Sequence, residues 1–215
     1  MPIDLSNLLA GLEFRRGRSA TVAVLTMELQ RGVIGDLATF PQLREAVEAR
    51  GAGLAAAILC DGARARNWPV VHCLAEFRPD WSGSVMNTPL HTAMSRIPGH
   101  LVSGTPAVQL IPELQGHEDD LLVARTSGVS PFLGTGLDQL LRSLGVTVIV
   151  VSGVSVNLGV LGLCIEAANL GYQIVLATNA VAGIPTEYAD RVINETLSLI
   201  STLATVDEIL SAAPL

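Results

Sequence analysis

Apolar runs rich in β-branched residues alternate with longer stretches of helical periodicity, and this alternation constrains the fold more than any other feature of the chain. The runs are continuous in hydrophobicity, which is typical of parallel strands covered on both faces. The sequence therefore predicts an α/β fold with a doubly wound, mainly parallel sheet. The predicted strands are 21–27, 69–74, 121–124, 146–152 and 173–178. The predicted helices are 39–66, 134–144, 157–170 and 186–201, followed by a short apolar stretch at 202–206 and a capped turn near Asp207.

Length and patterning predict one main domain. The chain has 215 residues, which suits a single α/β domain at 19–215 preceded by an N-terminal extension at 1–18. The extension carries Arg15, Arg16 and Arg18 after its apolar stretch and has no secretory cleavage pattern. We expect a cytoplasmic protein whose extension contributes to an interface between subunits.

Charge and composition exclude several classes of function. The formal charge is −7, which disfavours nucleic acid and anionic membranes as partners. All 13 basic residues are arginine, so mechanisms that require a lysine amine are excluded. The three cysteines form no CxxC motif and are expected to be reduced thiols. The charge-free segment 143–165 contains a polar turn at its centre, which favours a buried strand and helix over a membrane span.

Common catalytic motifs are incomplete in this chain. Residues 153–157 approach the G-x-S-x-G elbow, but their last residue is Asn157 and no histidine follows His117. No glycine-rich nucleotide motif follows the first predicted strand. The histidines lack metal-ligand spacing, and His72 is expected to be a core histidine. We therefore predict neither a cofactor nor a metal.

Residues that follow the predicted strands are the main candidates for a site, because ligands of such sheets bind at the carboxyl ends of the strands. Glu28 follows the first strand and is a candidate acid or base. A solvated charge at a strand end is the alternative. After the second strand we expect a second carboxylate or an arginine that clamps the substrate, with aromatic side chains forming the wall of the pocket. The alternative is a solvated start of the loop. The residues concerned there are Glu76, Phe77, Arg78 and Trp81.

Four segments carry a family resemblance. The string 28–33 resembles the D-x-Q opening of the isochorismatase-like superfamily, also called the cysteine hydrolases, and 130–137 resembles its S-x-F-x-G-T-x-L. Residues 144–161 resemble L-G-V…V-x-G-V-x-x-N-x-C-V-L, and 171–176 continue the pattern. The resemblance covers roughly 20–183. It implies a three-layer α/β/α sheet of about six parallel strands, a small-molecule substrate, and a homodimer or homotetramer.

The same resemblance implies which residues do chemistry, and here the chain departs from the family. The Asp, Lys and Cys of the usual triad correspond to Glu28, Arg125 and Gly159. Cys164 lies about 7.5 Å along the helix and about 140° around it from position 159, so we expect an ordinary buried thiol. Cys73 is a weaker candidate nucleophile. A structural ion pair is the alternative role for Arg125, and helix packing the alternative for Gly159.

Isochorismatases proper also resemble this chain in having glycine at the nucleophile position. They protonate a vinyl ether with the first-strand carboxylate, and water then adds without a covalent intermediate. They carry Y-A-H where this chain has Ser155, Val156 and Asn157, and they keep a lysine. The backbone around 156–159 is expected to hold an oxyanion or carboxylate. A cis peptide is expected at or near Val154–Ser155.

Two hypotheses of different class follow. The first is an isochorismatase-like hydrolase that uses Glu28 for cysteine-independent acid–base hydrolysis of a vinyl ether or an amide. In it Arg125, Glu76, Arg78 and Asn157 position an anionic or amide-bearing substrate. The alternative is a catalytically inactive ligand-binding or scaffold protein, because a fold alone does not imply an activity.

Overall fold

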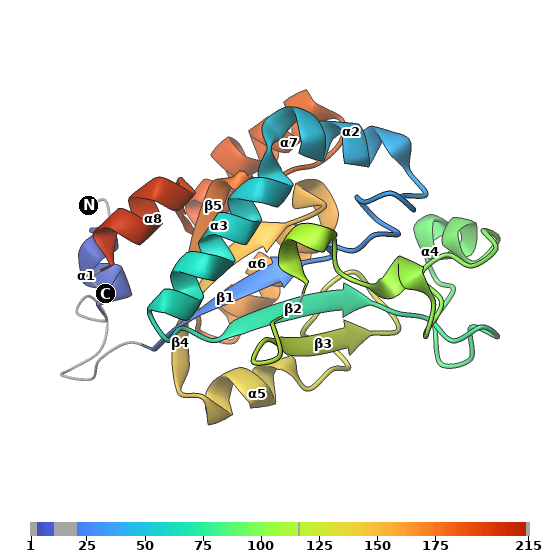
Figure 1. Cartoon of the computed structure of the whole chain (residues 1–215), viewed down its shortest axis with the longest axis horizontal. Helices are drawn as coiled ribbons and strands as arrows, with labels where there is room; N and C mark the ends of the chain where they lie inside the picture. Colours follow the sequence, from blue (N-terminus) through green and yellow to red (C-terminus); the bar gives the residue numbers. More distant parts are fainter. Residues whose placement is uncertain (1–3, 11–20, 116, 214–215) are drawn as a thin grey trace.

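Six parallel strands form one sheet in the order β3-β2-β1-β4-β5-β6 (Figure 1). We analysed a computed structural model, which describes residues 4–10, 21–115 and 117–213. The strands are β1 (Thr21–Met27), β2 (Val70–Ala75), β3 (Leu121–Arg125), β4 (Val146–Gly153), β5 (Gln173–Val181) and β6 (Thr202–Ala204). The expected three-layer α/β/α architecture is confirmed, and the five predicted runs form its first five strands.

Helices cover both faces of the sheet. One face packs against α1 (Leu5–Leu9), α2 (Pro41–Arg50), α3 (Ala52–Ala65) and α8 (Val206–Ala212). The other face packs against α5 (Leu137–Ser143), α6 (Leu161–Asn169) and α7 (Thr186–Arg191). Figure 1 shows α3 and α8 above the sheet and α5 below it. Two buried clusters result, one on each face, so the central strands carry apolar side chains on both sides.

Helix boundaries differ from the sequence prediction in three places. The stretch 39–66 forms two helices because Gly51 adopts a left-handed conformation with φ of 66° and ends α2. The stretch 157–170 begins with a π-helical turn at Val156–Val160 before α6. The stretch 186–201 continues from α7 into π-helical and 3₁₀ turns at Val192–Thr196 and Leu197–Leu199.

The turn predicted near Asp207 is the start of a helix. Thr205 and Glu208 form a reciprocal capping box there, in which each side chain accepts a hydrogen bond from the other's backbone N–H. This box begins α8.

The long connection after β2 holds only short helices. These are α4 (Pro89–Met94) and two 3₁₀ turns at Pro106–Val108 and Pro112–Leu114. The connection lies beside the carboxyl ends of the strands, on the right in Figure 1. It therefore supplies walls to any cavity that opens there.

The N-terminal extension is described only at residues 4–10. Its helix α1 contacts α8, and its Leu8 and Leu9 side chains are buried in the core. This part of the predicted extension therefore packs onto the domain, while the three arginines lie outside the described residues. Within the described ranges, no helix combines the length and apolarity needed to cross a membrane.

Candidate active site

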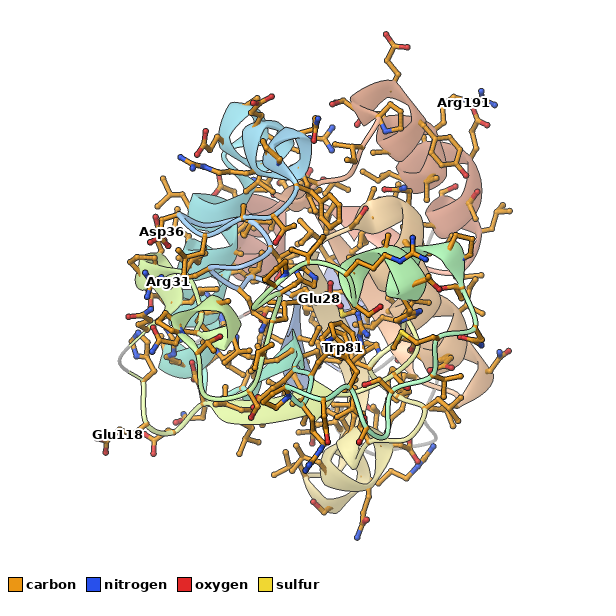
Figure 2. All side chains as sticks on the ribbon, turned by 90° about the vertical axis from the view of Figure 1, so that its right-hand side faces the viewer. Glu28, Arg31, Asp36, Trp81, Glu118 and Arg191 are labelled. Carbon is orange, nitrogen blue, oxygen red and sulfur yellow. The ribbon has the colours of Figure 1, made fainter. Side chains whose placement is uncertain are left out.

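A cavity of about 330 Å³ opens at the carboxyl ends of the central strands. Figure 2 looks onto this end of the sheet, with Glu28 near its centre. The lining is mainly apolar: Val33, Phe40, Leu43, Ala75, Leu90, Met94, Leu101, Val129, Leu158, Gly159 and Ile184. Five polar side chains also line it: Glu28, His100, Arg125, Ser155 and Asn157. Such a small, apolar cavity with a few polar groups is typical of a small-molecule site.

A larger hollow lies elsewhere, beside the N-terminal end of α3. It measures about 690 Å³ and holds the ion pairs Arg31–Asp36 and Arg44–Glu48. Figure 2 shows Arg31 and Asp36 together, away from Glu28. Because these exposed charges neutralise each other, this hollow offers no comparable reactive group.

The end of β1 is shaped to turn Glu28 toward the cavity. The Glu28 N–H still donates to the Cys73 carbonyl at 2.9 Å, but its φ of 51° lies in the left-handed region. Few residues other than glycine adopt this conformation, which clusters at functional sites. Two residues on, the buried Gln30 side chain donates to the Ala75 and Val108 carbonyls at 3.0 Å each and accepts from the Ala75 N–H at 2.8 Å. Gln30 therefore joins the ends of β1 and β2 and is structural.

Glu28 and Arg125 form a buried ion pair. Arg125 ends β3, two strands from β1, and its Nε lies 3.1 Å from Glu28 Oε1. Its Nη2 contacts the same oxygen and its Nη1 donates to the Gly128 carbonyl. The side chains are only 6% and 14% exposed for Arg125 and Glu28. Within the described part of the chain, Glu28 Oε2 has no hydrogen-bond partner. The geometry therefore offers a carboxyl group with one oxygen left free for a ligand or water.

The turn after β4 brings two more polar side chains to the cavity. The peptide bond Val154–Ser155 is cis, as expected. Gly153 has a φ of 109°, and a Cβ there would collide with the Met27 backbone, so only glycine lets β4 approach β1 this closely. The Ser155 hydroxyl donates to Asn157 Oδ1.

Backbone donors in this turn are mostly engaged already. The Val156 N–H donates to the Ala182 carbonyl at 2.8 Å, and those of Leu158 and Val160 donate to the Ser155 carbonyl at 3.0 Å. The N–H groups of Val156 and Leu158 are therefore already engaged, whereas those of Asn157 and Gly159 have no acceptor outside the turn among the described residues. The expected anion cradle stays a prediction that rests on these two donors. Val156 is fully buried in the core and does not line the cavity.

Gly159 lines the cavity, and the space beside it is filled by Met27. A Cβ built at position 159 would lie 3.0 Å from Met27 Cε and 3.2 Å from the Val154 carbonyl oxygen. Contacts this short require the neighbour to move. The Met27 thioether chain therefore occupies space next to the position where the family resemblance places a nucleophile.

No cysteine lines the cavity. Cys60, Cys73 and Cys164 are all buried, and burial raises the pKa of each thiol to about 12. The thiolate is the nucleophilic form, so at neutral pH these groups are inert. The expected buried environment of Cys164 is confirmed.

The segment that follows β2 lies outside the cavity, contrary to the sequence prediction. Glu76 accepts a hydrogen bond from the Ser103 hydroxyl, and Arg78 is exposed and paired with Asp80 at 3.1 Å. Phe77 is buried and stacks on Trp81, with ring centroids 4.3 Å apart. None of the four residues Glu76, Phe77, Arg78 and Trp81 is among the lining residues.

The backbone explains this difference. The Phe77 N–H donates to the Leu101 carbonyl, and the Ser103 N–H donates to the Phe77 carbonyl, both at 2.8 Å. This bridge extends the line of β2 under the loop 99–103 and turns the Phe77 side chain into the core. The segment therefore supports the cavity wall from behind, and it is Leu101 and its neighbour His100 that reach the cavity.

Sequence reasoning missed His100. It lies in the long connection, with Gly99 and Leu101 on either side in left-handed conformations. Its Nδ1 is 2.9 Å from the Thr39 hydroxyl, and its ring packs edge-on against Phe40. Burial lowers its pKa to about 4, so the ring is neutral at pH 7. No motif marks this position, because Thr39 and His100 are 61 residues apart.

His72, by contrast, is structural. His72 is fully buried, as expected, and bridges the Thr26 hydroxyl and the Asp120 carboxylate at 2.7 and 3.0 Å. Burial lowers the pKa of His72 as well. Across the described ranges, no group of three His, Cys, Asp or Glu side chains is placed to hold a metal ion.

Comparisons with known proteins agree with this architecture. The family model described as the isochorismatase domain matches residues 22–208. The uncharacterised isochorismatase family protein YecD of Escherichia coli O157:H7 is 26% identical over 199 residues, which cover 89% of this chain and 96% of YecD. An isochorismatase family protein from Desulfovibrio vulgaris subsp. vulgaris str. Hildenborough has a TM-score of 0.77 at 25% identity, over 89% of this chain and 97% of that one. The N-carbamoylsarcosine amidase of Thermoplasma acidophilum shares the fold, with a TM-score of 0.70 at 23% identity over 88% and 98% of the two chains. Because the family model spans most of the sequence, this chain belongs to the isochorismatase family.

Proposed function

We propose that this protein hydrolyses a small, neutral, largely apolar amide or ester, with Glu28 as general base and water as nucleophile. One observation carries the proposal. The Glu28–Arg125 ion pair lies in a mainly apolar cavity whose lining contains no thiol. A carboxylate held in such a place is suited to take a proton from water, and the described lining offers no cysteine as a nucleophile.

The reaction balances without any further reactant. The Glu28 carboxylate accepts a proton from water while the water oxygen bonds to the substrate carbonyl carbon, and the carbonyl π electrons move to its oxygen. Arg125 uses three of its five N–H donors on Glu28 and Gly128. Its remaining donors and the Asn157 N–H stabilise the oxyanion. The intermediate then breaks its C–N or C–O bond, the proton on Glu28 passes to the leaving group, and Glu28 returns to the carboxylate.

Charge in the cavity favours a neutral substrate. Glu28 and Arg125 neutralise each other, and Arg78, expected to hold an anion, lies outside and is paired with Asp80. An anionic substrate would therefore lose its hydration without meeting an unpaired cation. The guanidinium of Arg125 also favours the amide or ester over the vinyl ether, because hydrolysis of an amide or ester passes through an oxyanion, whereas hydrolysis of a vinyl ether passes through an oxocarbenium cation.

A substrate panel tests the proposal. We would assay wild-type protein with amides, esters and enol ethers of up to about twelve heavy atoms, each paired with an analogue that carries a carboxylate. Turnover is expected for neutral amides or esters, and Cys73→Ala and Cys164→Ala should keep kcat/KM within about twofold, since neither thiol lines the cavity. Turnover confined to the anionic analogues, or loss of turnover in Cys73→Ala, would contradict the proposal. Tight binding without turnover of any compound would instead support a non-catalytic ligand-binding protein.

A further inference from the structure

Three histidines of this protein share one arrangement with a threonine, and comparing them identifies an unfilled position in the cavity. In each, the ring Nδ1 lies within hydrogen-bond distance of a threonine hydroxyl. The pairs are His72 with Thr26 at 2.7 Å, His91 with Thr88 at 2.7 Å, and His100 with Thr39 at 2.9 Å.

Chemistry fixes the proton positions in the first two pairs. His72 Nε2 lies 3.0 Å from the Asp120 carboxylate, and His91 Nε2 lies 3.0 Å from the Gly128 carbonyl. Both oxygens only accept hydrogen bonds, so Nε2 carries the proton in each ring. In a neutral ring Nδ1 is then an acceptor, and it takes the proton of the threonine hydroxyl.

His100 repeats the arrangement with one difference. It is buried, being only 5% exposed, and it lines the cavity. Its Nε2 has no hydrogen-bond partner in the part of the chain that the structure describes. Burial lowers its pKa to about 4, so at pH 7 the ring is neutral and has one donor and one acceptor nitrogen. By analogy with the other two pairs we assign the Thr39 hydroxyl as the donor to Nδ1. This assignment leaves the Nε2–H as a donor without an acceptor among the described residues.

From this comparison we propose that the ligand itself supplies the missing acceptor: His100 Nε2–H binds a carbonyl, ether or similar oxygen of the substrate, remote from the bond that is hydrolysed. His100 is then a specificity-determining residue. The substrate class narrows to neutral molecules with a hydrolysable group at the Glu28–Arg125 pair, an apolar body and a second acceptor oxygen. The part about hydrolysis rests on the proposed function, whereas the acceptor at His100 does not.

The surroundings of His100 hold its ring in place. Phe40 packs edge-on against it with centroids 6.1 Å apart, and the bridge between Phe77 and the loop 101–103 fixes the backbone that follows it. Because the ring is already fixed, little conformational entropy is lost when it binds a ligand. A ligand without the acceptor oxygen would cover the donor and leave it unpaired, which weakens the binding of that ligand. This is the physical basis for discrimination.

The tautomer of His100 is the first test, and it needs no ligand. Long-range ¹H–¹⁵N NMR of ¹⁵N-labelled wild-type protein at pH 7 should give a protonated Nε2 and an unprotonated Nδ1 for His100. A ring protonated on Nδ1 would overturn the donor assignment. Thr39→Val is the matched variant, because it removes the hydroxyl proton and leaves the ring; it should raise the Nδ1–H population.

Matched ligands are the second test. The probes are 3- and 4-acetylcyclohexanone, whose acetyl group has the shape of a carboxamide but is not hydrolysed, and their methylidene analogues, in which a carbon of similar size replaces the ring ketone oxygen. Binding is measured by calorimetry to the wild type, to His100→Phe and to Glu28→Gln. Wild type should bind at least one keto member about tenfold more tightly than its methylidene partner, as expected for a hydrogen bond to a buried donor. His100→Phe should lose that preference.

The Glu28→Gln variant separates the two proposals. It should keep the keto preference even though the proposed function requires it to lose turnover. A keto preference in a protein that hydrolyses nothing would leave the His100 inference standing and contradict the hydrolase. Equal binding of both members of every pair, no binding of the keto members, or an unchanged preference in His100→Phe would overturn the inference.

Discussion

At the scale of single residues, arginine stands in place of the lysine of the expected triad, and glycine stands in place of its cysteine. Arginine keeps its proton under all ordinary conditions, so Arg125 can stabilise charge but cannot transfer a proton. Its long, forked side chain reaches Glu28 from two strands away. Proton transfer is therefore left to Glu28 and water, which is why the proposed mechanism rests on one carboxylate.

Met27 and Gly159 form a packed pair, and their coupling can be measured. We predict that Gly159→Ala destabilises the protein by about 1–3 kcal/mol, because its Cβ would press on Met27 Cε at 3.0 Å. Adding Met27→Val should recover at least half of that loss, since the shorter side chain frees the space. Urea unfolding of both single variants and the double variant gives the coupling free energy. Additive effects would show that the two side chains do not compete for space.

His100 predicts a pH dependence of stability. Its pKa falls from an ordinary value of 6.5 to about 4 in the folded protein. Between these values the unfolded chain binds a proton that the folded chain does not, so stability falls as the pH is lowered from 6.5 to 4 and is fully present above 6.5. Between pH 7 and pH 5, the free energy of unfolding of His100→Phe should fall by about 1 kcal/mol less than that of the wild type, after allowance for solvent screening. Urea unfolding at both pH values measures this, and parallel losses would contradict the buried, neutral ring.

At the scale of elements, a buried polar network joins α3 to three neighbouring strands. Asp120, just before β3, accepts from Arg64 of α3 at 2.6 Å and from His72 of β2 at 3.0 Å. His72 in turn meets Thr26 of β1. Charged networks of this kind are costly to break when they are buried.

Asp120→Ala should therefore destabilise the protein by about 3 kcal/mol, because it leaves His72 Nε2 and the Nε and Nη2 of Arg64 without the acceptor that they share. Asp61→Ala is the matched control, since Asp61 pairs with the same Arg64 but is 70% exposed. It should change the free energy of unfolding by less than about 0.5 kcal/mol. Both values come from urea denaturation. Similar effects of the two substitutions would show that burial of the network contributes nothing.

The presence of the helices and strands was easier to predict from the sequence than the residues at which they begin and end. The strands are apparent in the sequence because burial on both faces demands unbroken apolar runs, and β1 matches its prediction at both ends. The break at Gly51 and the π-helical turn at Val156–Val160 depend on tertiary packing and caps, which periodicity does not report. The bridge between Phe77 and the loop 101–103 is equally invisible in sequence, and it is why the predicted cavity residues after β2 became its support.

The candidate active site also contains residues that were predictable from the sequence and residues that were not. Glu28, Arg125, Ser155, Asn157 and Gly159 were predictable because each follows a strand, and topology gathers the strand ends at one edge of the sheet. His100 was not, because its partner Thr39 lies 61 residues away and neither follows a strand. Arg125 forms the ion pair that was one of its two expected roles, because its side chain reaches Glu28 across β2. Its catalytic role stays a proposal.

At the scale of the whole molecule, assembly stays a prediction from family resemblance. We expect a homodimer or homotetramer, and sedimentation velocity at micromolar concentration measures this directly. Large apolar side chains are exposed on this chain, among them Leu133 and Leu199, which are about four-fifths exposed. A subunit interface over such groups would remove them from water. A species at the 22.5 kDa mass of one chain at all concentrations would contradict the expectation.

The central claim is that one carboxylate, held by an arginine and helped by no thiol, performs the hydrolysis. The most direct test is kcat/KM for Glu28→Gln, with circular dichroism to show that the variant folds, on the best neutral amide or ester of the panel. Glutamine keeps the shape and one hydrogen-bonding oxygen but cannot accept a proton, so we predict a loss of at least about 100-fold. Turnover within a few-fold of wild type would contradict the account.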